Sequence, residues 1–351
     1  MRRADQLPAM EHFDIVIIGG GPGGLSCARV LAESGVDVLL LERKKNIGPK
    51  VCAGGITWDG LIQKVPEKLI ERTFHEQFIF SSYQKICFKK HDPIIATIDR
   101  VNLGQWMAER ARAEGAHIRS GWHVRNISEN IITASDDRGR PVTIQFNHLV
   151  GADGSSSNVR RFLNIPSQRV GIGINYQVPG HYDHMEWHLN TSFFGNGYGW
   201  IFPHKNSISI GGYASRNSLT PTELNKRLRI WGETRGFKLK NHPARAETIN
   251  YDYRGYRFGN IWLVGDAAGM ASGLTGEGIQ PAIISGEAVA RKIIDPSYPA
   301  EEINTLVKKQ KIHQRIIDLS AGNRTFCTLL METLVLLLRL RLIDFQKHLS
   351  M

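Results

Sequence analysis

The pattern of apolar and polar residues in the first part of the chain predicts a strand, a helix and a second strand. The run Ile15–Ile18 is short, apolar and β-branched, which is typical of a buried parallel strand. Leu25, Ala28 and Leu31 follow at helical spacing, and Gly35 ends the predicted helix before another apolar run begins. The pattern therefore predicts a β-α-β unit.

The turn inside this unit carries the first candidate chemistry. Gly19, Gly21 and Gly24 have the spacing G-x-G-x-x-G, and Glu42 ends the second strand about 18 residues later. Gly19 permits a tight turn, Gly21 lets the backbone approach a pyrophosphate, and Gly24 lets helix and strand pack closely. A carboxylate such as Glu42 binds a free ribose 2′-hydroxyl and repels a 2′-phosphate, so the unit predicts FAD or NAD rather than NADP.

Three later segments extend the pattern. Arg100 precedes residues 101–116, whose apolar positions fall on one face of a predicted amphipathic helix. One apolar strand ends at Asp153, and another ends at Asp266. A glycine-rich loop and a long helix, beginning at about Gly278, follow the second of these strands.

These segments, in this order, resemble the flavoprotein fold shared by aromatic hydroxylases and geranylgeranyl reductases, over roughly residues 11–290. The resemblance implies an α/β fold with a Rossmann-like, three-layer FAD-binding domain of the glutathione-reductase type, an antiparallel β-sheet substrate domain and a C-terminal helical segment. It implies FAD as the cofactor. The cofactor-binding residues that it implies are Gly19, Gly21, Gly24, Glu42, Arg43, Cys52, Ala53, Gly55, Arg100, Val124, Asp153, Asp266, Gly276, Gly278 and Ile279.

The resemblance also implies a role for several of these residues. Asp266 would bind the ribityl chain, Asp153 would lie near the pyrophosphate, and Arg100 would contact the phosphates. The loop at residues 276–279 would offer backbone N–H groups to the flavin ring, beside a helix N-terminus that stabilises the anionic reduced flavin. Taken singly, Asp153 and Asp266 also fit the role of helix caps, and Arg100 also fits a surface ion pair.

Two local motifs narrow the resemblance to the geranylgeranyl reductases. One is Cys52-Ala53-Gly54-Gly55, and the other is Tyr198-x-Trp200-x-Phe202-Pro203, which resembles their lipid-recognition motif. The aromatic residues of the second motif alternate, so in a strand they share one face. They form either an apolar wall for an isoprenoid chain or part of an ordinary core. The predicted substrate-binding residues are Tyr198, Trp200, Phe202 and Pro203, and the predicted catalytic residues are Cys52, Tyr198 and Trp200.

The predicted function is an FAD-dependent oxidoreductase that reduces isolated C=C bonds of a geranylgeranyl or other isoprenoid chain by hydride transfer. Two alternatives remain open: an FAD-dependent monooxygenase acting on an aromatic substrate, and a non-catalytic flavin-binding redox protein at a membrane. The chain has no second G-x-G-x-x-G unit. Its electron donor is therefore expected to be external, with ferredoxin and NAD(P)H both open.

The segments predict a discontinuous FAD-binding domain over 11–60, 95–170 and 255–295. Residues 61–94 and 171–254 form the predicted substrate-binding β-sheet domain, and 296–351 the C-terminal helical segment. In that last segment the apolar run Leu329–Leu338 is interrupted by Glu332 and followed by Arg339 and Arg341. It predicts either a buried helix that closes the substrate cavity or a helix in the membrane interface.

Composition and charge limit which partners and which cellular location the sequence predicts. Lys and Arg exceed Asp and Glu by 44 − 33 = 11. No RNP-like, zinc-finger or helix-turn-helix signature accompanies this charge, so no nucleic-acid partner is predicted, whereas an anionic membrane surface stays open. The four cysteines form no close pair, which predicts a reducing compartment and no metal site. The expected location is cytoplasmic, with peripheral attachment to the inner face of the cell membrane left open.

Overall fold

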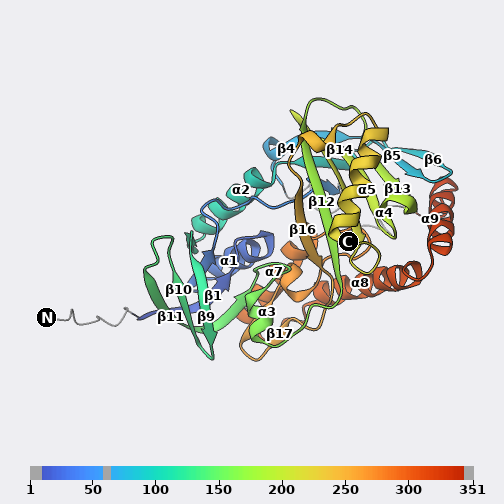
Figure 1. The fold of residues 1–351 in the computed structure, drawn as a ribbon. Coiled ribbons are helices and arrows are strands. Elements are labelled where there is room, and N and C mark those ends of the chain that lie inside the picture. The colour runs from blue at the N-terminus through green and yellow to red at the C-terminus, as the bar shows by residue number, and fades with distance from the viewer. Residues whose placement is uncertain (1–9, 58–64, 344–351) are drawn as a thin grey trace.

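The computed structural model describes residues 10–57 and 65–343, which build two large sheets, one small sheet and their covering helices (Figure 1). The first large sheet holds the predicted β-α-β unit. Across it, the strands are β17 (Arg257–Phe258), β18 (Ile261–Leu263), β11 (Pro141–Gly151), β1 (Met10–Ile18), β2 (Val38–Glu42) and β8 (His117–Ser120). The five strands from β18 to β8 run parallel, and β9 (His123–Ser128) and β10 (Ile131–Ser135) extend β11 as an antiparallel flap.

Small residues let the helices of this sheet pack closely. α1 (Pro22–Glu33) contacts both α2 (Arg100–Ala113) and α7 (Ile279–Ile294). A side chain at Gly286 would collide with the carbonyl of Gly23, so these two glycines permit the contact between α1 and α7. The central strands are apolar on both faces, as burial between layers requires, and Val16, Ile17, Leu39 and Leu40 are fully buried.

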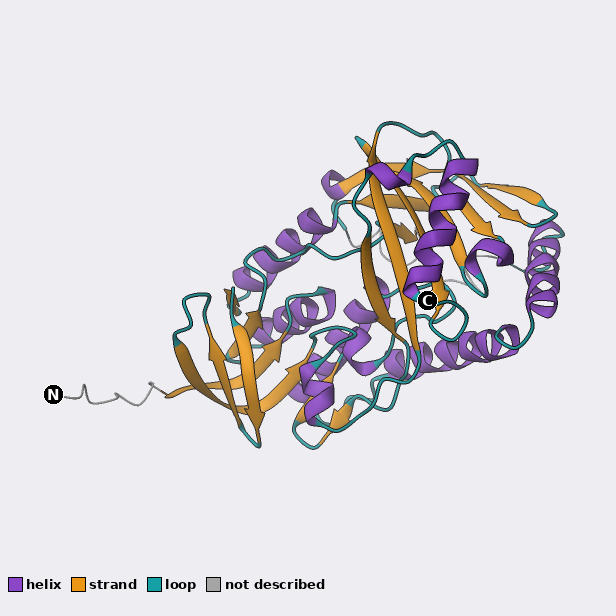
Figure 2. Ribbon diagram, viewed as in Figure 1, coloured by secondary structure: helices purple, strands orange, loops and turns teal. Residues whose placement is uncertain are grey.

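The second large sheet is mainly antiparallel (Figure 2). Across it, the strands are β16 (Arg245–Asn250), β12 (Val170–Pro179), β15 (Ser207–Ser215), β14 (Tyr198–Pro203), β13 (Glu186–Leu189), β5 (Glu76–Ser81) and β6 (Lys85–Lys89). Only the β13–β5 pair is parallel. α5 (Pro221–Thr234) packs on β12 and β15 and begins with a capping box between Thr220 and Glu223.

A three-stranded sheet links the two large ones. It consists of β3 (Gly55–Thr57), β7 (Ile95–Ile98) and β4 (Ile70–Phe74). The short helices are α3 (Asn158–Phe162), α4 (Thr191–Phe194), α6 (Gly265–Ala268), η2 (Glu67–Leu69) and η3 (Leu239–Asn241). The chain then continues into α8 (Glu301–Ser320) and α9 (Arg324–Arg339), and α9 lies along the outer edge of the molecule in Figure 1.

The predicted fold class is confirmed, since the structure combines a Rossmann-like α/β unit, an antiparallel sheet and C-terminal helices. The domain boundaries stay a prediction, and the predicted segments include residues 58–64 and 344–351, which lie outside the described residues. Within the described ranges, no helix combines the length and the hydropathy needed to cross a membrane.

Candidate flavin and substrate site

Both large sheets contribute to one cavity of about 590 Å³. Two predicted site residues, Gly24 and Pro203, do not line it. All the others do: Gly19, Gly21, Glu42, Arg43, Cys52, Ala53, Gly55, Arg100, Val124, Asp153, Tyr198, Trp200, Phe202, Asp266, Gly276, Gly278 and Ile279. The tertiary structure thus brings together residues from most of the length of the chain, and their individual roles stay predictions.

The glycine turn forms one wall of the cavity. Gly19 has φ +111°, and a side chain there would collide with the backbone of Ala152. At Gly21 an added Cβ would meet no heavy atom within 4 Å, which leaves open space beside the backbone where α1 begins. Gly24 instead faces the Gly19 carbonyl, so it serves the packing of helix on strand. This is the cradle that a pyrophosphate requires at a helix N-terminus.

Glu42 stands beside this turn, at the end of β2. Its carboxylate accepts hydrogen bonds from the Gly20 amide at 2.6 Å and from the Lys44 amide at 2.8 Å. These two bonds fix the carboxylate at the carboxyl edge of the parallel sheet, where a ribose hydroxyl would meet it.

Two buried polar atoms on the nucleotide side of the cavity have no hydrogen-bond partner within the described part of the protein. They are Arg100 Nε, on the first residue of α2, and Asp153 Oδ1. The other oxygen of Asp153 accepts from the amide of Asn158 at 2.6 Å, so this aspartate also acts as a cap for α3. Burial raises the pKa of Asp153 and outweighs its hydrogen bonds. Orphaned buried polar atoms that face a cavity fit a bound polar cofactor that would satisfy them.

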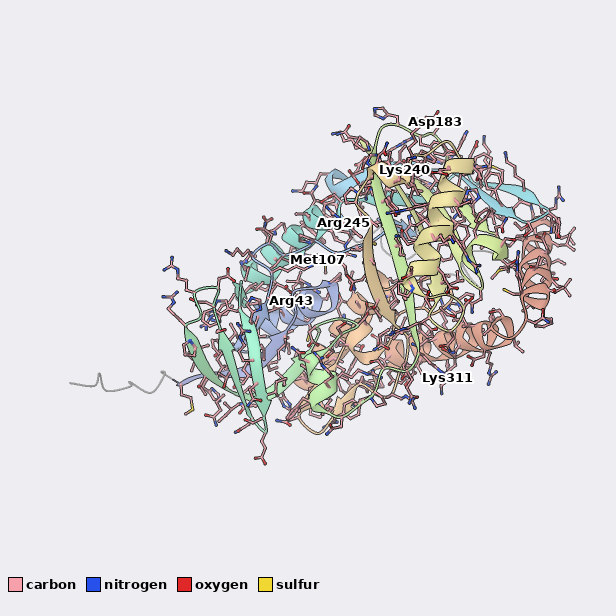
Figure 3. All side chains as sticks on the ribbon, in the orientation of Figure 1. Arg43, Met107, Asp183, Lys240, Arg245 and Lys311 are labelled. Carbon is pink, nitrogen blue, oxygen red and sulfur yellow. The ribbon has the colours of Figure 1, made fainter. Side chains whose placement is uncertain are left out.

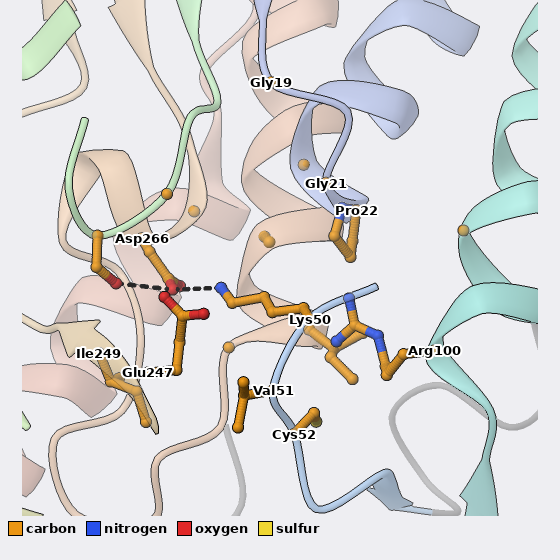
Figure 4. Close-up of a pocket in the computed structure, with 18 of the residues that line it drawn as sticks. Gly19, Gly21, Pro22, Lys50, Val51, Cys52, Arg100, Glu247, Ile249 and Asp266 are labelled. Atoms are coloured by element: carbon orange, nitrogen blue, oxygen red, sulfur yellow. Dashed lines mark hydrogen bonds and ion pairs between the residues drawn. The ribbon is translucent and has the colours of Figure 1, made fainter. Parts of the chain in front are cut away.

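Asp266 forms the centre of a small polar cluster (Figure 4). Its Oδ2 accepts from Lys50 Nζ at 2.9 Å and from Ser155 Oγ at 3.1 Å. Burial opposes the charge of Lys50, but the Asp266 carboxylate outweighs it, so the pKa of Lys50 is raised. A Cβ at Gly278 would lie 3.0 Å from Asp266 Oδ1, which shows how closely the start of α7 approaches. The N-terminal dipole of α7 therefore faces this part of the cavity.

The segment Cys52–Gly55 lies between the two walls and is held by its carbonyl groups. Asn175 Nδ2 donates to the Cys52 carbonyl at 2.7 Å, and the backbone amide of Ile98 donates to the Gly54 carbonyl at 3.0 Å. His204 holds the carbonyl of Ala53 between these two, at 2.9 Å from Nε2. Three separate segments, β12, β7 and the residue after β14, thus fix the backbone next to Cys52.

Both ring nitrogens of His204 form hydrogen bonds. Its Nε2 faces a carbonyl, which can only accept, and its Nδ1 lies 2.5 Å from Glu71 Oε2. Both ring nitrogens thus face oxygen acceptors, an arrangement that fits the doubly protonated imidazolium. Burial works against this charge, but the hydrogen bonds to Glu71 and Ala53 outweigh it and raise the pKa of His204.

The opposite wall of the cavity is aromatic. Tyr198, Trp200 and Phe202 share one face of β14, with ring centroids 6.0 Å apart for Tyr198–Trp200 and 6.4 Å apart for Trp200–Phe202. Trp187, directly across from Trp200 in the β13–β14 register, stacks on Tyr198 at 5.1 Å. All four rings line the cavity.

The polar atoms of Tyr198, Trp200 and Tyr213 are satisfied by neighbouring protein groups. The Tyr198 hydroxyl donates to the Thr275 carbonyl, and the Tyr213 hydroxyl donates to the Gly273 carbonyl at 2.7 Å. Trp200 Nε1 donates to Ser209 Oγ at 3.0 Å. What these side chains offer a ligand is therefore the apolar faces of their rings.

Several residues that line the cavity are not predicted from the sequence. They include Lys50, Trp187, Asn175, Tyr213 and Glu247. Trp187 and Tyr213 belong to strands on either side of β14, and no short motif marks them; only the strand register shows that they face Trp200 and Tyr198. Pro203, by contrast, ends β14 outside the cavity, where its carbonyl accepts from Thr97 Oγ1.

Comparison with known protein families supports the assignment of this cavity to a flavin cofactor. Residues 12–298 match the family described as "FAD binding domain". The chain belongs to this family. It is an FAD-dependent oxidoreductase, and its cofactor is FAD, which the cradle, the orphaned polar atoms and Glu42 all fit.

Two relatives and one solved structure resemble this chain over most of its length. An uncharacterized protein of Methanosarcina barkeri is 30% identical over 88% of this chain and 81% of its own length. Digeranylgeranylglycerophospholipid reductase 2 of Methanosphaera stadtmanae is 27% identical over 87% of this chain and 84% of its own. A geranylgeranyl bacteriochlorophyll reductase-like structure from Thermoplasma acidophilum aligns with TM-score 0.75 and 21% identity over 90% of this chain and 93% of its own, which supports the fold. The resemblance to geranylgeranyl reductases is confirmed.

Proposed function

We propose that this oxidoreductase saturates isolated C=C bonds in the isoprenoid chain of a lipid. One observation carries the proposal: the nucleotide cradle and the aromatic wall line the same cavity. The relative from Methanosphaera stadtmanae is named for reduction of a digeranylgeranyl lipid, which supports a geranylgeranyl substrate here. The ring faces of Tyr198, Trp200 and Phe202 match such an apolar, unsaturated chain.

The chemistry explains the need for a dry aromatic wall. Reduced FAD, when bound, supplies a hydride. An isolated trisubstituted alkene has no carbonyl to hold negative charge, so its saturation also takes a proton at one carbon and places positive character on the other. The quadrupoles of ring faces stabilise a cation, and the buried wall keeps water from trapping it.

The side chains divide this work between them. Burial raises the pKa of Tyr198 far above its usual range, so this residue keeps its proton and acts through its ring. Cys52 lines the cavity between the two walls, and Glu277 lines it near Tyr198. We assign the proton to the Cys52 thiol or to water beside Glu277, and a Cys52→Ala variant distinguishes these two sources. The hydride electrons are restored by an external donor, either ferredoxin or a reduced nicotinamide.

An anaerobic turnover experiment tests the proposal. The purified holoprotein is photoreduced without oxygen and mixed with a geranylgeranyl lipid, and the same lipid with a fully saturated chain is the control. The flavin absorbance should return with the unsaturated lipid alone, and mass spectrometry should find pairs of added hydrogens in the product. Flavin that stays reduced with the unsaturated lipid would contradict the proposal. A hydroxylated aromatic product that forms only with oxygen would make the protein a monooxygenase instead.

A further inference from the structure

Helix α9 carries two apolar faces on opposite sides. The first contacts the body of the protein through Cys327, Met331, Val335 and Leu338, all of them buried. These residues are spaced by four, four and three positions, as one face of a helix requires. They pack in the core cluster that holds the aromatic wall, together with Ile79 and Leu189. This face explains why α9 stays attached to the sheet.

The second face points to solvent. We define the outer face of α9 as Phe326, Leu329, Thr333 and Leu336, continued by Leu340 just after the helix. Their spacing of three, four, three and four places them on one side, nearly opposite the buried face. Leu329 is 61% exposed, Leu336 is 45% exposed and Leu340 is 58% exposed. A helix that is apolar on both sides needs a second apolar partner.

Charge shows what kind of partner fits. The single acid of α9, Glu332, is turned away to the β5–β6 turn, where Ser81 Oγ and the Ser82 amide donate to its carboxylate, each at 2.8 Å. Arg339 ends α9 and Arg341 follows it, both exposed, whereas Arg324 at the other end of the helix is bound to Ser192 Oγ of α4. The exposed basic residues of α8 are Lys308, Lys311 and Arg315, and Figure 3 shows Lys311 at the lower edge of the molecule, pointing outward.

We infer that the outer face of α9 binds the surface of an anionic phospholipid membrane. Its leucines and Phe326 lie at the boundary between headgroups and acyl chains, and its arginines meet the headgroup phosphates. A second copy of the chain is the less suitable occupant. A symmetric dimer through this face would offer Arg339 and Arg341 no acid of α9 as a partner, because Glu332 is bound to the β5–β6 turn.

A small apolar pocket lies between α9 and the aromatic wall, on the side of the helix that faces the body of the protein. Met331, Leu334 and Leu338 of α9 line it from above. Trp187 and Tyr198 line it from below, and the same two rings also line the main cavity. A lipid chain that leaves the bilayer under α9 would therefore meet the aromatic wall directly. This part of the inference rests on the proposed function, whereas membrane binding by the outer face does not.

Vesicle sedimentation tests the membrane contact with the full-length holoprotein. The vesicles contain equal parts of phosphatidylcholine and phosphatidylglycerol, or phosphatidylcholine alone. Wild-type protein should sediment with the anionic vesicles, and less so as salt is raised. The double variant Leu329→Gln with Leu336→Gln should lower the partition coefficient about tenfold. The matched control Ile230→Gln changes an apolar residue of α5 that is 48% exposed, and should bind as the wild type does.

Each contrary result overturns the inference. Wild-type protein that stays in solution with anionic vesicles removes the membrane contact. Equal binding by the double variant moves the contact to another surface. A dimer that falls apart in the double variant, with no vesicle present, assigns the outer face to a second copy. Far-ultraviolet circular dichroism and flavin content show that every variant is folded.

A turnover assay then separates the inference from the proposed function. The double variant should lose turnover of a geranylgeranyl lipid embedded in anionic vesicles and keep turnover of the same lipid in detergent micelles. Equal loss in both would contradict delivery under α9. Absence of wild-type turnover in both would refute the proposed function, and the sedimentation result would still decide the membrane contact.

Discussion

The two walls of the cavity contrast in chemistry and in origin. The nucleotide wall consists of backbone and charge: open space at Gly21, the Glu42 carboxylate, and the unpartnered polar atoms of Arg100 and Asp153 within the described residues. The substrate wall consists of ring faces, and the polar atoms of Tyr198 and Trp200 are already bound by protein. A polar cofactor and an apolar chain can therefore be held side by side, each by the wall that suits it.

The walls also differ in how much substitution they should tolerate. Close backbone packing fixes the nucleotide wall, so a single added carbon matters there. Stacked side chains build the substrate wall, so it should tolerate an exchange of rings better than the loss of one.

The largest effect is expected from Trp200→Ala in the substrate wall. Trp200 is buried and contacts rings on both sides, so the free energy of unfolding should fall by about 3–5 kcal/mol. Turnover of a prenyl lipid should drop sharply, while folded protein keeps its FAD because the cradle lies on the other wall. Urea unfolding, flavin content and turnover measure these effects. Trp200→Phe is the control that retains a ring, and unchanged turnover in Trp200→Ala would remove this residue from the site.

The next effect distinguishes two glycines of the nucleotide wall. Gly24→Ala places a methyl group against the Gly19 carbonyl and should lower the unfolding free energy of the apoprotein by about 3 kcal/mol. Gly21→Ala meets no neighbour, so the apoprotein should lose at most about 1 kcal/mol. FAD titration should nevertheless show weakened binding, because the methyl group fills space proposed for the pyrophosphate. Equal stability of the two variants would refute this division of roles.

A smaller effect than those of Trp200→Ala and Gly24→Ala is expected at His204, which holds the segment between the walls. The pKa of His204 is raised in the folded protein above its ordinary value of 6.5, so the folded state binds this proton more tightly than the unfolded state. The resulting stabilisation is complete below pH 6.5 and is lost as the pH rises through the raised pKa.

The variant His204→Gln should therefore cost about 2 kcal/mol below pH 6.5 and show a flatter dependence of stability on pH. Urea unfolding across this pH range measures both quantities. His181→Gln, at an exposed position, is the matched control and should follow the wild type. If His204→Gln kept the full pH dependence, the imidazolium would not be what holds the Ala53 carbonyl.

Sequence reasoning worked best where the elements of a site are close along the chain. Gly19, Gly21 and Glu42 belong to one β-α-β unit, so their spacing alone indicates their placement at one sheet edge. The shared face of Tyr198 and Trp200 follows from the two-residue period of a strand.

Contacts between elements that are distant along the chain were harder to predict from the sequence. The contact of Glu71, His204 and the Ala53 carbonyl joins three separate segments, none of which carries a motif for it. Pro203 was expected in the cavity because its motif is contiguous, but the strand ends there and its carbonyl is used by Thr97.

Helix α9 shows most clearly which features local sequence predicts and which depend on the tertiary structure. The sequence by itself determined that residues near Leu329–Leu338 form an apolar element too short to cross a bilayer, because composition and length suffice for that. Since leucines cover more than half of the circumference of the helix, periodicity alone could not choose its inner face. Only docking against β5 and α4 decided that Met331 and Val335 are buried while Leu329 and Leu336 face outward. Burial depends on what the rest of the chain places beside a residue, and local sequence does not contain that information.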